Sequence, residues 1–279
     1  MAKPKIAILG AGASAAYASR ALEDLDLRPT IFAEKSGVYQ KGAFYFHWLP
    51  PDVAELVEQE RVATVGIGLR ETYIERQWGK YDPKWESSFP KEDTYQSTPC
   101  YNPSIAYDKL LGVNVEINPT VRLSKGDIVD IANTFDLVIQ TFPESQTFKA
   151  NGKYIYRIPV APYYAEDEEI DYIRETYLPP IVRHTPNFIV YNGREDKDWC
   201  RMCYMWGNLT FEYPYYHTEF AGQEDIQMLW DLHPDCPPQE EATYADNIIL
   251  MGRLAMMEPK FLSHEAYEYT LAIVEELYG

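Results

Sequence analysis

The residues best suited to chemistry begin with two glycines close to the amino terminus. Gly10 and Gly12 follow a short apolar run and open a stretch of small, helix-forming residues. Gly10 permits a tight turn, Gly12 lets the backbone approach a diphosphate, and the small Ala15 allows a helix to pack closely on its strands. The N–H groups at the start of that helix, around Ala13 and Ser14, are then free to face phosphate groups.

Glu34 ends the next strand-like segment, residues 29–34. A carboxylate at this position accepts hydrogen bonds from ribose hydroxyls, and its charge argues against a 2′-phosphate. An ordinary strand–helix–strand unit with a glycine turn is the alternative interpretation. The order of strand, glycine turn, helix, strand and acid favours dinucleotide binding, but it does not distinguish FAD from NAD.

The carboxyl-terminal segment carries a second glycine beside an arginine. Residues 246–253 form a buried strand pattern that ends in Gly252 and Arg253, and residues 261–265 open a helix that continues to Leu277. Ser263 is a suitable cap for this helix. Simpler interpretations are a surface ion pair for Arg253 and a capping role alone for Ser263.

These segments, in this order, resemble the glutathione-reductase-type FAD proteins, most closely the amine oxidase and UDP-galactopyranose mutase branch. The strand and turn at 135–143, with Thr141 and Pro143, match the segment that crosses beside the cofactor in those families. Residues 113–118, with Val121, resemble the segment that faces the adenine. The resemblance implies that Arg253 contacts the pyrophosphate and that the last helix points its amino end, at Leu262 and Ser263, toward the flavin pyrimidine.

FAD is therefore the expected cofactor. The expected cofactor-binding residues are Gly10, Gly12, Ala13, Ser14, Ala15, Glu34, Lys35, Gly42, Ala43, Val121, Thr141, Pro143, Gly252, Arg253, Leu262 and Ser263.

The expected fold class is α/β, a discontinuous Rossmann-like FAD-binding domain with an inserted α+β substrate domain built on an antiparallel sheet. Residues 1–50, 101–145 and 244–279 are assigned to the first domain, and residues 51–100 and 146–243 to the second. In the second, strands are predicted at 153–158, 187–191 and 199–206, with a turn at Asn192-Gly193. Amphipathic helices are predicted at 165–177 and 224–230.

His47 and Arg201 are the candidate catalytic residues. His47 follows a segment that runs along the flavin ring in related flavoproteins, although a packed aromatic strand explains the same residues. Arg201 lies among aromatic residues and could bind a substrate carboxylate or phosphate, although a paired arginine of the sheet is the commoner case. Cys200 and Cys203 lie on one predicted strand, where alternation sends them to opposite faces and opposes a disulfide.

Composition limits the partners. The chain has 279 residues and a net charge of −18, which disfavours duplex nucleic acid as a partner without excluding it. No apolar stretch approaches the length that a bilayer requires, no cysteine and histidine spacing indicates a metal site, and a reducing cytoplasm is the expected compartment.

The expected function is that of an FAD-dependent, amine-oxidase-like oxidoreductase. It would oxidise the C–N bond of an amine or amino-acid-like group, free or attached to a larger molecule such as a modified nucleobase, by hydride transfer to flavin N5, with O₂ as a possible electron acceptor. There are two alternatives: a redox-neutral flavin enzyme resembling UDP-galactopyranose mutase, and a non-catalytic FAD-binding protein.

Overall fold

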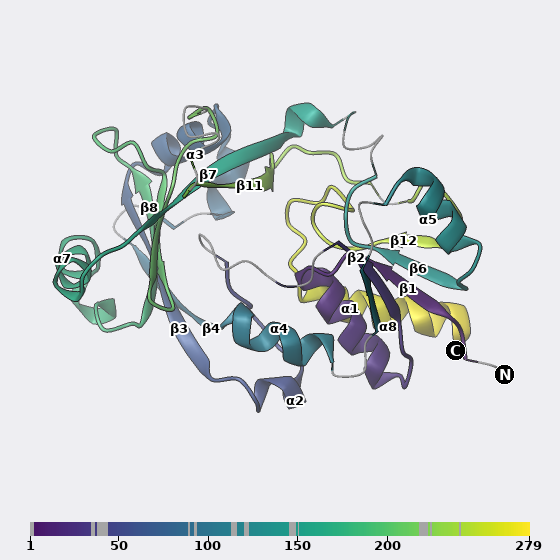
Figure 1. The fold of residues 1–279 in the computed structure, drawn as a ribbon. Helices are drawn as coiled ribbons and strands as arrows, with labels where there is room; N and C mark the ends of the chain where they lie inside the picture. The colour runs from purple at the N-terminus through teal and green to yellow at the C-terminus, as the bar shows by residue number, and fades with distance from the viewer. Residues whose placement is uncertain are drawn as a thin grey trace.

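The computed structural model places the chain in two sheets (Figure 1). It describes residues 3–34, 37, 44–88, 90–91, 94–112, 116–119, 123–144, 149, 151–217, 223, 225–239 and 241–279, with the backbone alone for 87, 88 and 116–119. Lys35, Gly42, Ala43 and Val121, which were expected to bind the cofactor, lie outside these residues.

The first sheet is parallel throughout and has the strand order β12-β6-β1-β2-β5. Its strands are β1 (Ile6–Leu9), β2 (Thr30–Ala33), β5 (Glu116–Pro119), β6 (Leu137–Gln140) and β12 (Ile248–Leu250). The three strands that carry the proposed nucleotide motifs, β1, β6 and β12, are therefore neighbours, although β12 comes from the far end of the chain.

Helices cover both faces of this sheet because its central strand is apolar on both sides. Ile6 and Ile8 of β1 pack in one cluster with α1 (Ala13–Asp24), α4 (Pro103–Leu111) and α8 (Glu265–Tyr278). Ala7 and Leu9 pack in another cluster with α5 (Lys125–Ala132). Alternate residues of one strand thus hold helices on opposite faces, as expected for a buried parallel strand. The short helix α2 (Pro51–Ala54) joins α1 through an ion pair between Asp52 and Arg20.

The second sheet has the strand order β11-β7-β10-β9-β8-β3-β4. Its strands are β3 (Gln59–Gly68), β4 (Tyr95–Tyr101), β7 (Ile155–Tyr163), β8 (Asn187–Gly193), β9 (Arg201–Met205), β10 (Asn208–Glu212) and β11 (Gln227–Leu232). The helices of this part are α3 (Arg70–Trp78) and α7 (Asp167–Tyr177), with 3₁₀ turns at Pro83–Ser88, Gly152–Tyr154 and Pro180–Val182. One face packs against α7, and the other contacts Tyr45 from the segment after β2.

The antiparallel sheet expected from the sequence is in fact mixed. β3 runs parallel to β8, with Val62 opposite Asn187, whereas every other neighbouring pair is antiparallel. β3 lies far from β8 in the chain and is joined to it through α3, β4 and the first sheet. No turn chemistry near either strand indicates its direction, so local sequence could not predict this pairing.

One of the two helices predicted in this part is instead a strand. The sequence predicts a helix at 224–230, but residues 227–230 belong to strand β11, which pairs with β7 from Gln227↔Val160 to Leu232↔Ile155. Its exposed Trp230 stacks against Arg157 of β7 instead of lying on a helix face. The helix expected at 165–177 is present as α7.

The turn predicted at Asn192-Gly193 is wrong in position, because both residues belong to β8 and the turn follows them. The Asn192 side chain accepts the Arg194 N–H at 2.9 Å and donates to the Trp199 carbonyl at 2.7 Å, so it closes the loop from within the strand. A Cβ on Gly193 would lie 1.9 Å from the carbonyl oxygen of Leu69. Glycine is required here by a close approach of two backbones and not by a turn.

Residues from distant parts of the sequence join the two sheets. Arg253, just after β12, forms an ion pair with Asp231 of β11 at 3.2 Å. Phe46 forms an isolated antiparallel bridge with Tyr101 at the end of β4. Among the described residues, no helix is both long and apolar enough to cross a bilayer.

Candidate functional site

A turn at the carboxyl end of β1 forms the centre of the candidate site. Gly10 has a φ of 98°, a conformation that residues with a side chain rarely adopt. A Cβ there would lie 2.4 Å from Oγ1 of Thr141, whose hydroxyl donates to the Leu9 carbonyl at 2.9 Å. The turn and the end of β6 are therefore packed directly against each other.

Gly12 begins helix α1, and the space beside it is open. A Cβ on Gly12 would meet no atom of the described residues within 4 Å. No side chain caps α1, and its first turn holds no acidic residue. The N–H groups of the first turn of a helix carry a partial positive charge, so this end of α1 can attract an anion even in a strongly acidic protein.

The carboxyl-terminal segment meets the same turn. Gly252 also has a φ of 98°, and a Cβ on it would lie 2.5 Å from Oγ of Ser14 in the first turn of α1. Residues from the two ends of the sequence therefore form one cradle, which we define as Gly10, Gly12, Ser14, Thr141 and Gly252. Glu34 is exposed immediately after β2, the strand beside β1.

Arg253 lies at the edge of this cradle but already has a partner. Its Nη1 is 3.2 Å from Oδ1 of Asp231, and the arginine side chain is 43% exposed, so part of the side chain remains open to solvent. Burial raises the pKa of Asp231, and Arg253 opposes that rise. The ion pair considered in the sequence is present, and its partner comes from the second sheet.

The amino end of α8 differs in detail from the sequence prediction. The helix starts at Glu265, with His264 and not Ser263 as its N-cap, and no side chain caps it. The Leu262 N–H instead donates to the carboxylate of Glu265, one turn ahead. Glu265 reaches back to this N–H as an acidic residue does in a capping box, so the serine is not needed for that bond.

His47 lies beside the amino end of α8. Its ring centre is 6.1 Å from that of His264 and 4.5 Å from that of Tyr45. Burial lowers the pKa of His47, and the neighbouring His264 lowers it further. The imidazole is therefore neutral near pH 7 and able to accept a proton.

Arg201 is part of a buried ion pair on the face of the second sheet that carries Tyr45. Its Nε donates to Oε2 of Glu212 at 2.7 Å and its Nη2 reaches the same oxygen. Burial alone would lower the pKa of Arg201, but Glu212 raises it well above the ordinary value. The guanidinium also lies over the ring of Tyr191, at 5.7 Å. Arg201 is a paired residue of the sheet, the commoner case named from the sequence.

Cys200 and Cys203 are buried free thiols, as are Cys100 and Cys236. Burial raises the pKa of both Cys200 and Cys203, so neither thiol is activated as a nucleophile. No group of three or more histidine, cysteine and acidic side chains within the described residues has the arrangement of a metal site.

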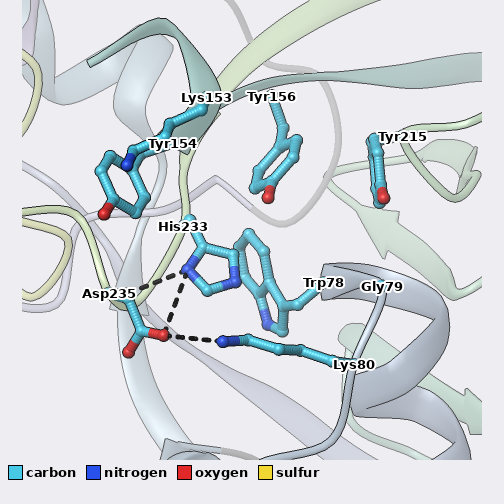
Figure 2. Close-up of a pocket in the computed structure, with 9 residues that line it drawn as sticks. All are labelled: Trp78, Gly79, Lys80, Lys153, Tyr154, Tyr156, Tyr215, His233 and Asp235. Atoms are coloured by element: carbon cyan, nitrogen blue, oxygen red, sulfur yellow. Dashed lines mark hydrogen bonds and ion pairs between the residues drawn. The ribbon is translucent and has the colours of Figure 1, made fainter. Parts of the chain in front are cut away.

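A pocket that the sequence did not indicate lies between α3, β7 and the end of β11 (Figure 2). His233 and Asp235 come from the segment after β11, and Trp78 and Lys80 come from the end of α3. The only local signal was a histidine two residues before an aspartate, which is too common to interpret. Their partners come from elements more than a hundred residues apart in sequence, so only the folded chain brings them together.

Comparisons with known proteins give a fold and no family. No family model matches the chain, and no curated protein matches its sequence. The structure is similar to a flavin-dependent brominase, with a TM-score of 0.52 and 12% identity over 99% of this chain and 80% of that one. It is also similar to the glycine oxidase of Bacillus cereus, with a TM-score of 0.52 and 9% identity over 99% of this chain and 96% of that one. The L-proline dehydrogenase of P. horikoshii gives a TM-score of 0.51 and 9% identity, over 98% of this chain and 93% of that one.

The chain therefore has the two-sheet fold of these proteins over nearly its whole length. At this level of identity the likeness concerns the fold, and an activity must be argued from the residues of the site.

Proposed function

We propose that this protein binds FAD and is an FAD-dependent oxidoreductase. The observation that carries the proposal is the cradle of Gly10, Gly12, Ser14, Thr141 and Gly252, in which both ends of the sequence meet at an uncapped helix start. A flavin-dependent enzyme is among the proteins that share the fold. The cradle fits a diphosphate because the side of Gly12 is open and the helix start offers N–H donors.

Each part of the proposed site has a separate role. The first turn of α1 holds the pyrophosphate, with Ala13, Ser14 and Ala15 supplying its backbone, and Glu34 accepts hydrogen bonds from the ribose. Lys35, Gly42, Ala43, Val121 and Pro143 are proposed to complete the nucleotide site. The exposed side of Arg253 makes a further contact with the pyrophosphate, and His47, Leu262 and Ser263 surround the flavin ring. Bound FAD supplies a two-electron acceptor.

We further propose oxidation of a C–N bond in an amine or amino-acid-like group, with O₂ as electron acceptor. Two observations support this class of reaction. A glycine oxidase and a proline dehydrogenase share the fold, and both names denote oxidation of amino acids. In addition, His47 is a neutral imidazole beside the amino end of α8, where it can accept a proton from an ammonium substrate and leave the amine uncharged. Arg201 is proposed to orient the substrate as a guanidinium whose Nε and Nη2 are already held by Glu212.

The first test is the absorbance spectrum of the purified protein, before and after incubation with FAD and removal of excess cofactor. A flavin band near 450 nm, released by denaturation as FAD in a ratio near one per chain, is the expected result. Protein that stays colourless after incubation contradicts the proposal.

Gly12→Glu tests the position of the cofactor. The added carboxylate would occupy the open space beside the start of α1 and repel the pyrophosphate, so FAD affinity should fall by about 100-fold or more. Gly126→Glu is the matched control, since Gly126 is an exposed residue in the first turn of α5, the helix on the opposite face of the same sheet. Equal FAD retention by the two variants would show that the site is elsewhere.

The reaction class is tested by mixing the FAD-loaded protein with a panel of primary, secondary and amino-acid amines without oxygen. Bleaching of the flavin band by one class, followed by peroxide formation when air is admitted, is the expected outcome. Turnover that requires pre-reduced flavin and transfers no net electrons would instead indicate a redox-neutral reaction.

A further inference from the structure

The pocket shown in Figure 2 has walls of aromatic rings. Its volume is about 350 Å³, within the range of small-molecule sites. Trp78 and Tyr156 have ring centres 5.9 Å apart, and Tyr156 and Tyr215 have ring centres 4.5 Å apart. A Cβ on Gly79 would lie 2.7 Å from the Tyr215 hydroxyl, so the absence of a side chain there lets this ring approach the end of α3.

The charge around the pocket is positive, in contrast to the net charge of −18 of the chain. Lys80 and Lys153 line it, against the single carboxylate of Asp235. That carboxylate is already shared: Lys80 lies 3.2 Å from it, and Lys84 pairs with its other oxygen. Lys153 has its ammonium over the ring of Tyr154, at 4.8 Å, and has no ion pair with any residue that the structure describes.

His233 adds no charge to this balance. Burial lowers its pKa, and Lys80 and Lys84 lower it further, against the opposing effect of Asp235. Its Nδ1 accepts the Asp235 N–H at 3.0 Å, so the proton of the neutral ring is on Nε2. The histidine therefore leaves the two lining lysines in excess over one carboxylate.

Polar donors are also in excess. Within the described residues, the hydroxyls of Tyr154, Tyr156 and Tyr215 have no recorded hydrogen bond. The buried indole N–H of Trp78 has no acceptor there either. Flat aromatic walls, unpaired donors and an excess of positive charge together suit a ligand with an aromatic ring and several acceptor oxygens.

We infer that this pocket binds a small aromatic carboxylate, with its ring against the wall formed by Trp78, Tyr156 and Tyr215 and its carboxylate at Lys153 and Lys80. The site is formed by the second sheet and its helix, and no cradle residue lines it. The inference goes beyond the proposed function and does not depend on bound FAD, although the pocket adjoins the first sheet through Tyr154, which packs with Leu254 and Met257.

The test is calorimetric titration of the whole protein with three probes that separate ring from charge. Indole-3-acetate carries both features, tryptamine has the same ring with a positive charge, and cyclohexylacetate has the charge without an aromatic ring. Indole-3-acetate should bind at least about tenfold more tightly than either of the others. Equal affinity for tryptamine overturns the electrostatic argument, and equal affinity for cyclohexylacetate overturns the aromatic one.

Lys153→Gln tests whether the ligand binds in this pocket. The Lys153 side chain is exposed, so it can be changed without disturbing the core. The variant should bind indole-3-acetate about fivefold more weakly. Its affinities for cyclohexylacetate and for tryptamine should become more similar, because the lost positive charge attracts the first and repels the second. Lys109→Gln, an exposed lysine on α4, is the matched control and should bind as the unmodified protein does. Unchanged binding by Lys153→Gln contradicts the inference.

The two proposals fail separately. Titrations are made on protein with and without added FAD, while flavin content is measured independently. Selective binding of indole-3-acetate by protein that takes up no FAD would remove the proposed function and leave the pocket. FAD uptake without selective binding would do the reverse.

Discussion

His47 and His233 are both neutral near pH 7, but different neighbours keep them so. Burial is the main cause for each, followed by His264 for His47 and by Lys80 and Lys84 for His233. His47 is exposed on one side and lies beside the start of α8, whereas His233 is 4% exposed and is enclosed by rings. Only His47 is therefore placed to exchange protons with a molecule from solution, and His233 serves to hold the end of β11.

We predict that the stability of the protein depends on pH because of the lowered pKa of His233. Its folded pKa is below the ordinary value of about 6.5, so the unfolded chain takes up a proton first as the pH falls. The stabilisation from the neutral ring is thus complete above about pH 6.5 and decreases as the pH falls toward the folded pKa. His233→Asn keeps an acceptor for the Asp235 N–H but cannot be protonated. Its free energy of unfolding in urea should be lower at pH 7.5 and should fall less than that of the unmodified protein by pH 5.5.

The quantity to compare is the slope of the free energy of unfolding against pH, because the carboxylates common to both proteins also titrate in this range. His184→Asn serves as the control, since His184 is an exposed histidine that does not line the pocket. If the difference in free energy of unfolding between the unmodified protein and His233→Asn stays constant with pH, the lowered pKa of His233 is contradicted.

Among the secondary-structure elements, the junction between β3 and α3 fixes the parallel pair β3–β8 of the second sheet. Gly68 ends β3 with a φ of 69°, and Gly193 ends β8 directly against Leu69. Arg76 of α3 then donates to the carbonyls of Arg194 and Lys197, at 2.7 and 2.6 Å. The loop after β8 is thereby fixed to α3, so the parallel pair β3–β8 and the helix that follows β3 form one packed unit.

Gly193→Ala tests this junction. A Cβ 1.9 Å from the Leu69 carbonyl cannot be accommodated without moving a backbone, so the free energy of unfolding should fall by about 2 kcal/mol or more. Gly152→Ala, where a Cβ would meet nothing within 4 Å, should change stability by no more than about 0.5 kcal/mol. Urea unfolding of both variants measures the difference, and similar values for the two would contradict the close approach.

At the scale of the whole molecule, Arg253 connects the two sheets and also lies at the edge of the proposed nucleotide site. Its ion pair with Asp231 is partly exposed, and a pair of this kind contributes about 0–1 kcal/mol. A contact with a pyrophosphate would contribute more, because the pyrophosphate carries two negative charges and the interaction is a charge-assisted hydrogen bond. Variants of Arg253 and Asp231 can therefore separate the contact between the sheets from the contact with the pyrophosphate.

Arg253→Gln should weaken FAD binding by about tenfold, whereas Asp231→Asn should not weaken it, because it leaves the arginine free for the phosphates. Both variants should change the free energy of unfolding of the FAD-free protein by a similar small amount. FAD affinity is measured by titration of the FAD-free protein. If Arg253→Gln retains full affinity, the arginine serves the contact between sheets alone.

Much of the first sheet and its glycine turn could be predicted from sequence because the signals are local. An apolar run, a glycine with a positive φ, a helix of small residues and a terminal acid follow one another within 34 positions, and each is required by backbone geometry at its own site. The resemblance to known FAD proteins also implied that residues near Gly252 return to this turn. The direction of β3 against β8, the strand at 227–232 and the aromatic pocket are different. They depend on which distant residues meet. Side chains such as Lys80, Lys153 and Asp235 come to line one pocket only when the second sheet has formed.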